Sequence, residues 1–495
     1  MVALSFRDLA RELRDMVYEY YVAIDGGYIF NLESGKLKAA SPRAHLFALQ
    51  QTCKRVADEL TGLALTHNLV TFSTIPCMRD RAFLVEFLFN LYFRFQVHAV
   101  IQHFDEKPAS NSLREAVARH YPSFLPCLNA SPDDWAPEDP DINVVRDVCD
   151  GNIGVARSSC HEFADFVLHH LEPDNATYPD AVRLRLSDKY WDIPSDEELD
   201  KMVKALRPTV AELEADHGPI IEFDGLWEEN RFLYRFSAAA AAIRFLRSNP
   251  SSRVHIRRIL LDEDREAVAY PETHGKGLVP FCTENPHIRI ERRVSLWKNM
   301  FSSICHSMRP SMWRSYGAEH HQKHRFEDSY LNDWYSRIGH CSVSNSVAKW
   351  ALEALGLPGS ISVVLDCDST PERCSQMLEE AVVQDAVWQK AQEECFARQL
   401  LPPPPIWEWR SIHSTNAFIC QDFPKIVQDI VNGTSVISCN FPINGFSDID
   451  VEQLIWDHRG MSRRLLRGGR LEHTRTIPSR TSFVKQTKIV RFSGS

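Results

Sequence analysis

The sequence has few of the features that mark secreted and metal-binding proteins. Its 495 residues include 13 cysteines, an odd number, and no two of them have C-x-x-C spacing. Scattered thiols indicate a reducing compartment and argue against a disulfide framework or a structural zinc site. No basic stretch followed by an apolar stretch opens the chain, so we expect no signal peptide. The composition therefore predicts a cytoplasmic or nuclear protein.

Long apolar runs and common enzyme motifs are also missing. The longest apolar stretch, 83–101, is interrupted by Glu86, Arg94 and His98. It therefore predicts a buried, aromatic-rich helix and no contact with a membrane. There is no G-x-S-x-G elbow, no G-x-x-x-x-G-K-[ST] or G-x-G-x-x-G loop and no H-E-x-x-H. The sequence thus indicates no enzyme activity and implies no cofactor.

Apolar residues make up 44% of the chain and charged residues 25%, which are ordinary values for a globular protein. A chain of this length needs more than one small core. Composition divides it into five expected segments: a helical module over 1–104, an acidic flexible linker over 105–152, a mixed helix–strand domain over 153–400, a proline-linked extension of that domain over 401–458, and a basic tail over 459–495 that is expected to be disordered.

The tail contains ten Lys or Arg residues and one acidic residue, Glu472, although the whole chain carries a net charge of −10. Such a tail can fold back on its own acidic body, serve nuclear import, contact a nucleic acid or remain solvated. Few aromatic residues lie between its basic ones, so stacking on single-stranded bases is not supported.

Two amphipathic helices are predicted near the amino terminus, over 8–22 and 44–65, followed by a strand over 69–72. A polar loop is expected between the helices, after Asp25-Gly26-Gly27. The apolar stripes are Leu9, Leu13, Met16, Val17 and Tyr20 in the first helix and Leu46, Leu49, Cys53, Val56, Ala57, Leu60 and Ala64 in the second.

The second half repeats one pattern four times, a helix, a tight turn and a short strand. Asn or Gly at the turns can supply the left-handed cap that ends a helix. The expected helices are 237–248, 273–284, 345–356 and 422–431, and the strands that follow them are 256–261, 288–290, 361–365 and 435–437. The pattern predicts a mixed α+β or α/β fold, either as a plain α/β layer or as an irregular, leucine-rich-repeat-like stack.

Two patterns favour the alternative of an orphan metal-dependent hydrolase or transferase. His320 and His324 would lie one turn apart on a helix, a spacing that lets two imidazoles reach one metal ion. Asp366 and Asp368 follow a predicted strand, where carboxylates can hold a metal ion or act as a general base. An exposed polar turn and a capped helix start would explain the same residues without chemistry.

The two amino-terminal segments resemble the opening of the F-box-like proteins of fungi. Leu9-Ala-Arg-Glu-Leu13 is similar to the Leu-Pro-x-Glu-Leu run that opens F-box motifs, with Ala10 in place of proline. Thr52-Cys-Lys-Arg55, followed by Asp58-Glu59, resembles the Thr-Cys-Arg-x-x-x-x-Glu stretch of the same fungal proteins. Residues 259–294 are similar to a later block in that group. The spacing between the two helices is longer than usual for an F-box motif.

This resemblance implies a protein-interaction protein, the substrate-recognition subunit of a cullin–RING ubiquitin ligase of the SCF type. In such proteins the first helices dock on a Skp-type adaptor, which joins them to the cullin, and the carboxyl-terminal region captures a substrate protein. The residues implied to face the adaptor are Leu9, Leu13 and Val17 on the first helix and Leu49 and Val56 on the second. Packing of these residues on one another is the alternative interpretation.

Overall fold

The computed structural model describes residues 6–41, 48–76, 109–125, 128, 155–171, 235–301, 340–400, 419–443 and 451–457, together with part of 190–204. Several sequence expectations fall outside these residues. They are the aromatic-rich helix expected over 83–101, most of the linker 105–152, the pair His320 and His324, and the basic tail 459–495.

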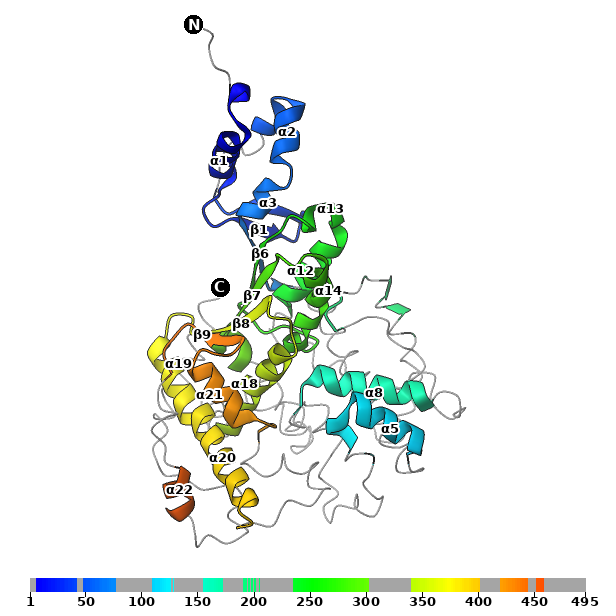
Figure 1. Ribbon diagram of the computed structural model, residues 1–495, viewed down its shortest axis with the longest axis vertical. Coiled ribbons are helices and arrows are strands. Elements are labelled where there is room, and N and C mark those ends of the chain that lie inside the picture. The colour runs from blue at the N-terminus through cyan, green and yellow to red at the C-terminus, as the bar shows by residue number, and fades with distance from the viewer. Residues whose placement is uncertain are drawn as a thin grey trace, which may run out of the picture.

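A seven-stranded sheet forms the centre of the fold (Figure 1). Its strands are β1 (Tyr28–Asn31), β2 (Lys36–Ala39), β3 (Leu69–Ser73), β6 (Arg258–Glu263), β7 (Arg289–Ser295), β8 (Ile361–Asp366) and β9 (Ile437–Cys439). The spatial order is β2-β1-β3-β6-β7-β8-β9, and every neighbouring pair is parallel except the β1–β2 hairpin. Beyond the hairpin the strands therefore lie side by side in chain order. β4 (Ile75–Pro76) and β5 (Arg235–Phe236) form a separate two-stranded sheet.

The α-helices with bounds in the described residues are α1 (Arg11–Val22), α2 (Lys54–Leu60), α3 (Leu63–His67), α5 (Asn111–His120), α8 (Arg157–Leu171), α12 (Ala238–Ser248), α13 (Pro250–Arg253), α14 (Val279–Glu284), α18 (His340–Leu355), α19 (Pro371–Met377), α20 (Gln384–Ala397), α21 (Phe423–Val431) and α22 (Val451–Asp457), and short 3-10 and π-helical segments lie between some of them. Together with the sheet they confirm the mixed α/β class.

All four predicted helix–strand units are present, although the first half of the helix expected over 273–284 belongs to a 3-10 helix, Pro271–Leu278, that precedes α14. α12, α14, α18 and α21 precede β6, β7, β8 and β9 in turn, with the short α13 inserted before β6. α12 starts at Ser237, whose hydroxyl accepts a hydrogen bond from the amide of Ala240 at 3.0 Å. Such a side-chain cap satisfies a backbone donor that the first helical turn leaves without a partner.

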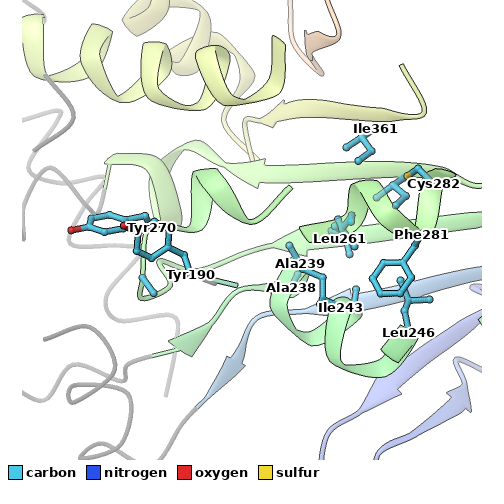
Figure 2. Packing of buried hydrophobic residues seen from close by; sticks show 14 of the residues in the cluster. Tyr190, Ala238, Ala239, Ile243, Leu246, Leu261, Tyr270, Phe281, Cys282 and Ile361 are labelled. Atoms are coloured by element: carbon cyan, nitrogen blue, oxygen red, sulfur yellow. The ribbon is translucent and has the colours of Figure 1, made fainter. Parts of the chain in front are cut away.

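One face of the sheet is covered. In β6, buried Ile259 and Leu261 alternate with half-exposed Leu260 and Asp262, and β7 and β8 alternate in the same way. Alternation at a period of two places successive side chains on opposite faces. α12 packs on β3 and β6, α18 on β8 and α21 on β9. Figure 2 shows the apolar side of α12 against this covered face.

A buried ion pair joins the sheet to these helices. Arg292 and Glu263 are 1% and 0% exposed, and their Nη2 and Oε1 atoms are 2.9 Å apart. Glu263 also accepts from the amide of Ala238 at 3.0 Å, so it stabilises the start of α12. Arg292 lies over the ring of Trp350, 4.7 Å from its centroid. The attraction between the two charges and their further contacts offset the free energy that is lost when charged groups leave water.

Two predictions for the amino-terminal segment are wrong. The expected polar loop after Gly27 contains the β1–β2 hairpin. The expected continuous helix 44–65 is interrupted twice in its described part, 48–65. Extended Cys53 separates the short 3-10 helix Leu49–Gln51 from α2, and Gly62, which is left-handed with φ of 74°, separates α2 from α3. A side chain at Gly62 would also collide with the ring of His255, 2.2 Å from the position of its Cβ.

The segments expected from composition share this single sheet. Strands β1–β3 come from 1–104, β6–β8 from 153–400 and β9 from 401–458. Phe72 of β3 packs against Phe245 of α12 with ring centroids 5.6 Å apart. The amino-terminal strands are therefore part of the central core, while the division of the chain into domains stays a prediction.

Candidate interaction surface

A carboxylate clamp fixes α1 against α2. Glu59 accepts hydrogen bonds from Arg14 at 2.7 Å and 3.0 Å, from the Tyr18 hydroxyl at 2.8 Å and from Arg55 at 3.1 Å. Arg14 is only 4% exposed. Charge-assisted hydrogen bonds to a carboxylate are shorter and roughly twice as strong as hydrogen bonds between neutral groups. Because Arg14 directly follows the first F-box-like run and Glu59 ends the second, the clamp connects the two segments that carry the resemblance.

The clamp changes the acid–base behaviour of Glu59. The hydrogen bond from Arg14 is the main cause that lowers its pKa to about 2, and the bonds from Tyr18 and Arg55 act in the same direction. Glu59 is therefore ionised at any pH at which the protein would work.

This arrangement decides which side of α1 is covered. Tyr18 and Val22 point inward and pack with Val56 and Leu60 of α2. The opposite side carries a row of exposed apolar side chains, hereafter the α1 stripe: Leu13 (50% exposed), Met16 (66%), Val17 (45%) and Tyr20 (85%). Their spacing of three and four residues places them on one face of the helix. In Figure 1, α1 and α2 lie beyond the end of the sheet.

The five residues implied to face an adaptor divide between this surface and the core. Leu13 and Val17 belong to the α1 stripe. Val56 is buried between the helices at 4% exposure, and Leu49 packs against the same cluster in a half-buried position. Leu9 is half-buried, and its carbonyl oxygen accepts from Arg14 Nη1 at 2.5 Å. The first helix therefore supplies the accessible part of the predicted set.

Two further members of the α1 stripe are not among the residues that the resemblance implied to face an adaptor. Met16 and Tyr20 have the largest exposed fractions of the four. Their helical spacing was visible in the sequence, but spacing identifies a common face and does not show whether that face is covered.

The carboxylates expected to bind a metal ion are already paired. Asp368 accepts from Ser295 Oγ at 2.7 Å and from Lys298 Nζ at 3.0 Å. Asp366 accepts from the backbone amide of Asp368 at 2.7 Å, and its other oxygen lies 3.7 Å from Nε of Arg293. Among the described residues, no three His, Cys, Asp or Glu side chains gather so that they could hold a metal ion.

Asp262 is a further carboxylate near this end of the sheet. Burial is the largest effect that raises its pKa, to about 6, followed by the nearby charge of Asp264. It lies opposite Arg293 in the β6–β7 register. Its only signal in the sequence was its place near the end of a predicted strand.

A serine–histidine pair occurs in the interior. Ser237 Oγ is 2.6 Å from Nδ1 of His274, and Nε2 of the same ring is 2.6 Å from the carbonyl oxygen of Ala269. Since a carbonyl only accepts, Nε2 donates and Nδ1 accepts from the serine. Burial lowers the pKa of His274 to about 3. Both side chains are inaccessible, at 0% and 1% exposure, so this pair supports the turn at Ala269, where φ is 61°.

Comparison of the chain with protein-family models, curated proteins and solved structures found no match. The F-box-like resemblance therefore stays a prediction from the sequence. Within the described residues, no helix has both the length and the apolar character needed to cross a lipid bilayer.

Proposed function

We propose that this chain is a protein-interaction protein that docks on a Skp-type adaptor through the α1 stripe and presents its carboxyl-terminal region to a substrate protein. The observation that carries the proposal is the exposure of Leu13, Met16, Val17 and Tyr20 on one face of α1. Four large apolar side chains in one row on a helix are typical of a helix that enters an apolar groove of a partner. Attachment to a cullin would follow through the adaptor.

The clamp supports this proposal because it holds α1 in a fixed position on α2, with the α1 stripe facing outward. Arg14 and Tyr18 are both bonded to Glu59, so the helix is held on two successive turns. A surface that is already in its binding conformation loses less conformational entropy on association. Burial of the α1 stripe against a partner would contribute favourably to the free energy of association, at about 25 cal/mol per Å² of apolar area removed from water.

The sheet supports the second half of the proposal. Parallel strands that follow chain order, with one face covered by helices, are also the arrangement of a leucine-rich-repeat-like stack. The other face carries half-exposed side chains such as Leu260, Val364 and Arg293. We infer that this face is available to a substrate protein.

A pair of aspartate substitutions in the α1 stripe tests the proposal. Leu13→Asp/Val17→Asp should weaken binding to a purified Skp-type adaptor at least about tenfold, because it places two charges in an apolar contact. Isothermal titration calorimetry with the full chain measures the change, and circular dichroism checks folding.

Leu355→Asp/Val254→Asp is the matched control, since these residues are exposed to a similar degree, 50% and 42%, and lie outside the stripe. The control should bind the adaptor like wild type. Failure of the wild-type chain to bind, or equal loss in both double variants, would refute adaptor docking through α1.

A further inference from the structure

The β1–β2 hairpin occupies the residues by which this chain departs from the F-box pattern. The two resembling segments are separated by a longer stretch than F-box motifs have, and residues 28–39 of that stretch form the hairpin. β2 stands at one end of the strand order, so among the described strands it has a neighbour on one side alone. Its other side is a sheet edge, where backbone groups can bond to a further strand.

The hydrogen bonding of the hairpin defines which backbone groups of β2 face this edge. The amide of Ala40 donates to the carbonyl oxygen of Gly27 at 2.9 Å. Bonded and non-bonded pairs alternate along an antiparallel ladder, so the β2 residues that bond to β1 are Lys38 and Lys36. The residues between and beside them, Leu37 and Ala39, therefore direct their N–H and C=O groups outward.

The side chains of β2 divide between two chemically different faces. Leu37 and Ala39 are half-buried, and Leu37 packs on the central core. Lys36 and Lys38 are exposed on the opposite face, where Lys38 lies opposite Ile29 of β1, which is 44% exposed. Within the part of the chain that the structure describes, neither lysine forms an ion pair with a carboxylate. The edge thus offers an apolar side and a positively charged side.

We propose that β2 accepts an extended acidic segment of a partner protein as an additional strand of the sheet. In strand addition, backbone hydrogen bonds provide affinity and alternate side chains provide specificity. Acidic side chains of the segment would lie beside Lys36 and Lys38, and the apolar side chains between them would cover Leu37 and Ala39. The expected segment therefore has an alternating acidic and apolar pattern.

A second copy of this chain is a poor occupant of the edge. Pairing of β2 with another β2 would place lysine beside lysine, and like charges in that position destabilise a sheet. A nucleic acid has no peptide backbone with which to continue the ladder. The contact uses the backbone of an edge strand and no residue of the α1 stripe, so the inference goes beyond adaptor docking and stands without it.

Fluorescence anisotropy with the full chain tests the inference. The first probe is a labelled peptide of about ten residues in which glutamate and valine alternate. The second has the same composition with the glutamates grouped at one end, and the third has lysine in place of glutamate. The alternating acidic peptide should bind at least about fivefold more tightly than either of the others, because it alone matches both sides of the edge.

Lys36→Glu/Lys38→Glu should reverse the charge preference, so that the lysine peptide binds at least about fivefold more tightly than the alternating acidic peptide. Lys54→Glu/Lys425→Glu is the matched control, because it makes the same change in charge at two exposed lysines on α2 and α21. The control should keep the preference of wild type. Thermal melting checks that each variant is folded.

Hydrogen exchange locates the bound peptide. Residue-resolved mass spectrometry should show that the amides of Leu37 and Ala39 exchange at least about fivefold more slowly with the acidic peptide, while those of Lys36 and Lys38, already bonded in the hairpin, change little. Ala39→Pro removes one outward donor at an edge position, where proline is tolerated, and should weaken binding. Equal binding of the alternating and grouped peptides, equal reversal in both charge variants, or protection of another segment instead of β2 would overturn the inference.

Discussion

Glu59 is the residue on which the placement of α1 depends most. It is the shared acceptor for side chains from both amino-terminal helices. Arg14 and Glu59 are 45 residues apart in the chain, so no local pattern connects them. Amphipathic spacing and the resemblance both pointed to the two segments, and the clamp gives a physical role to an arginine in the first segment and an acid in the second.

The depressed pKa of Glu59 predicts an acid-dependent loss of stability. The ordinary value of 4.5 applies in the unfolded chain, and the folded value is about 2. The stabilisation is therefore fully present above about pH 4.5 and is lost as the pH falls towards 2. Glu59→Gln should be less stable than wild type at pH 7, and this difference should shrink below pH 4.5.

Thermal melting of both proteins from pH 7 to pH 3 measures this difference. Glu12→Gln is the matched control, because Glu12 is exposed on α1 and lies outside the clamp. A difference between Glu59→Gln and wild type that is constant over the whole pH range would contradict the clamp.

At the scale of elements, sequence reasoning succeeded where the signal is local. The turns at Asn249-Pro250, Asn285-Pro286 and Asn432-Gly433 carry their own stop signals, and the helices before them and the strands after them are present. The hairpin was missed because its strands are short. Its partner β3 begins at Leu69, about thirty residues beyond β2 in the chain, and pairing at that distance has no local signature.

The same limit applies to the candidate sites. Helical spacing placed Leu13 and Val17 on one face of the first helix, where both are exposed, and the resemblance implied the same adaptor-facing role for Val56, which lies in the core. Spacing defines a face, and only the packing of a second element decides whether the face is covered. The outward direction of the Leu37 and Ala39 backbone depends on the register of a hairpin that was not predicted.

Gly62, between α2 and α3, allows a test at the level of elements. Gly62→Ala should destabilise the protein by about 2 kcal/mol or more, because it adds a left-handed alanine and a collision with His255. Gly35→Ala is the control, since its φ is also positive, at 63°, but nothing lies within 4 Å of the added carbon. The control should cost only about 1 kcal/mol. Urea unfolding of both variants measures the costs, and equal losses would show that the contact with His255 is unimportant.

At the scale of the whole molecule, the amino-terminal strands and the rest of the sheet share one core. Val70 and Phe72 of β3 belong to the same cluster as Ile259 and Leu261 of β6. These strands are hydrogen-bonded over five residue pairs, from Leu69–Arg258 to Ser73–Asp262. The stability of β6 therefore depends on residues that precede it by almost two hundred positions.

Deletion of residues 1–73 should disrupt the remaining sheet. The truncated chain would expose the edge of β6 and the apolar side of α12, and such edges lead to aggregation. We expect it to lose its cooperative melting transition and to elute as aggregates in size-exclusion chromatography. Deletion of residues 1–5 is the control and should leave both properties unchanged. A monomeric truncated chain with a wild-type transition would show that the amino-terminal segment folds separately.

The order of the strands also has a mechanical consequence. β9, the last strand in the chain, lies at one edge of the sheet, and each earlier strand down to β3 lies one place further in. A motor that pulled on the carboxyl-terminal end would load β9 across its few hydrogen bonds to β8 and peel it away. Once β9 has left, β8 would be the edge strand and would carry the force next, followed by β7. The sheet would unravel one strand at a time, at low force, and each step would leave a smaller sheet of the same order.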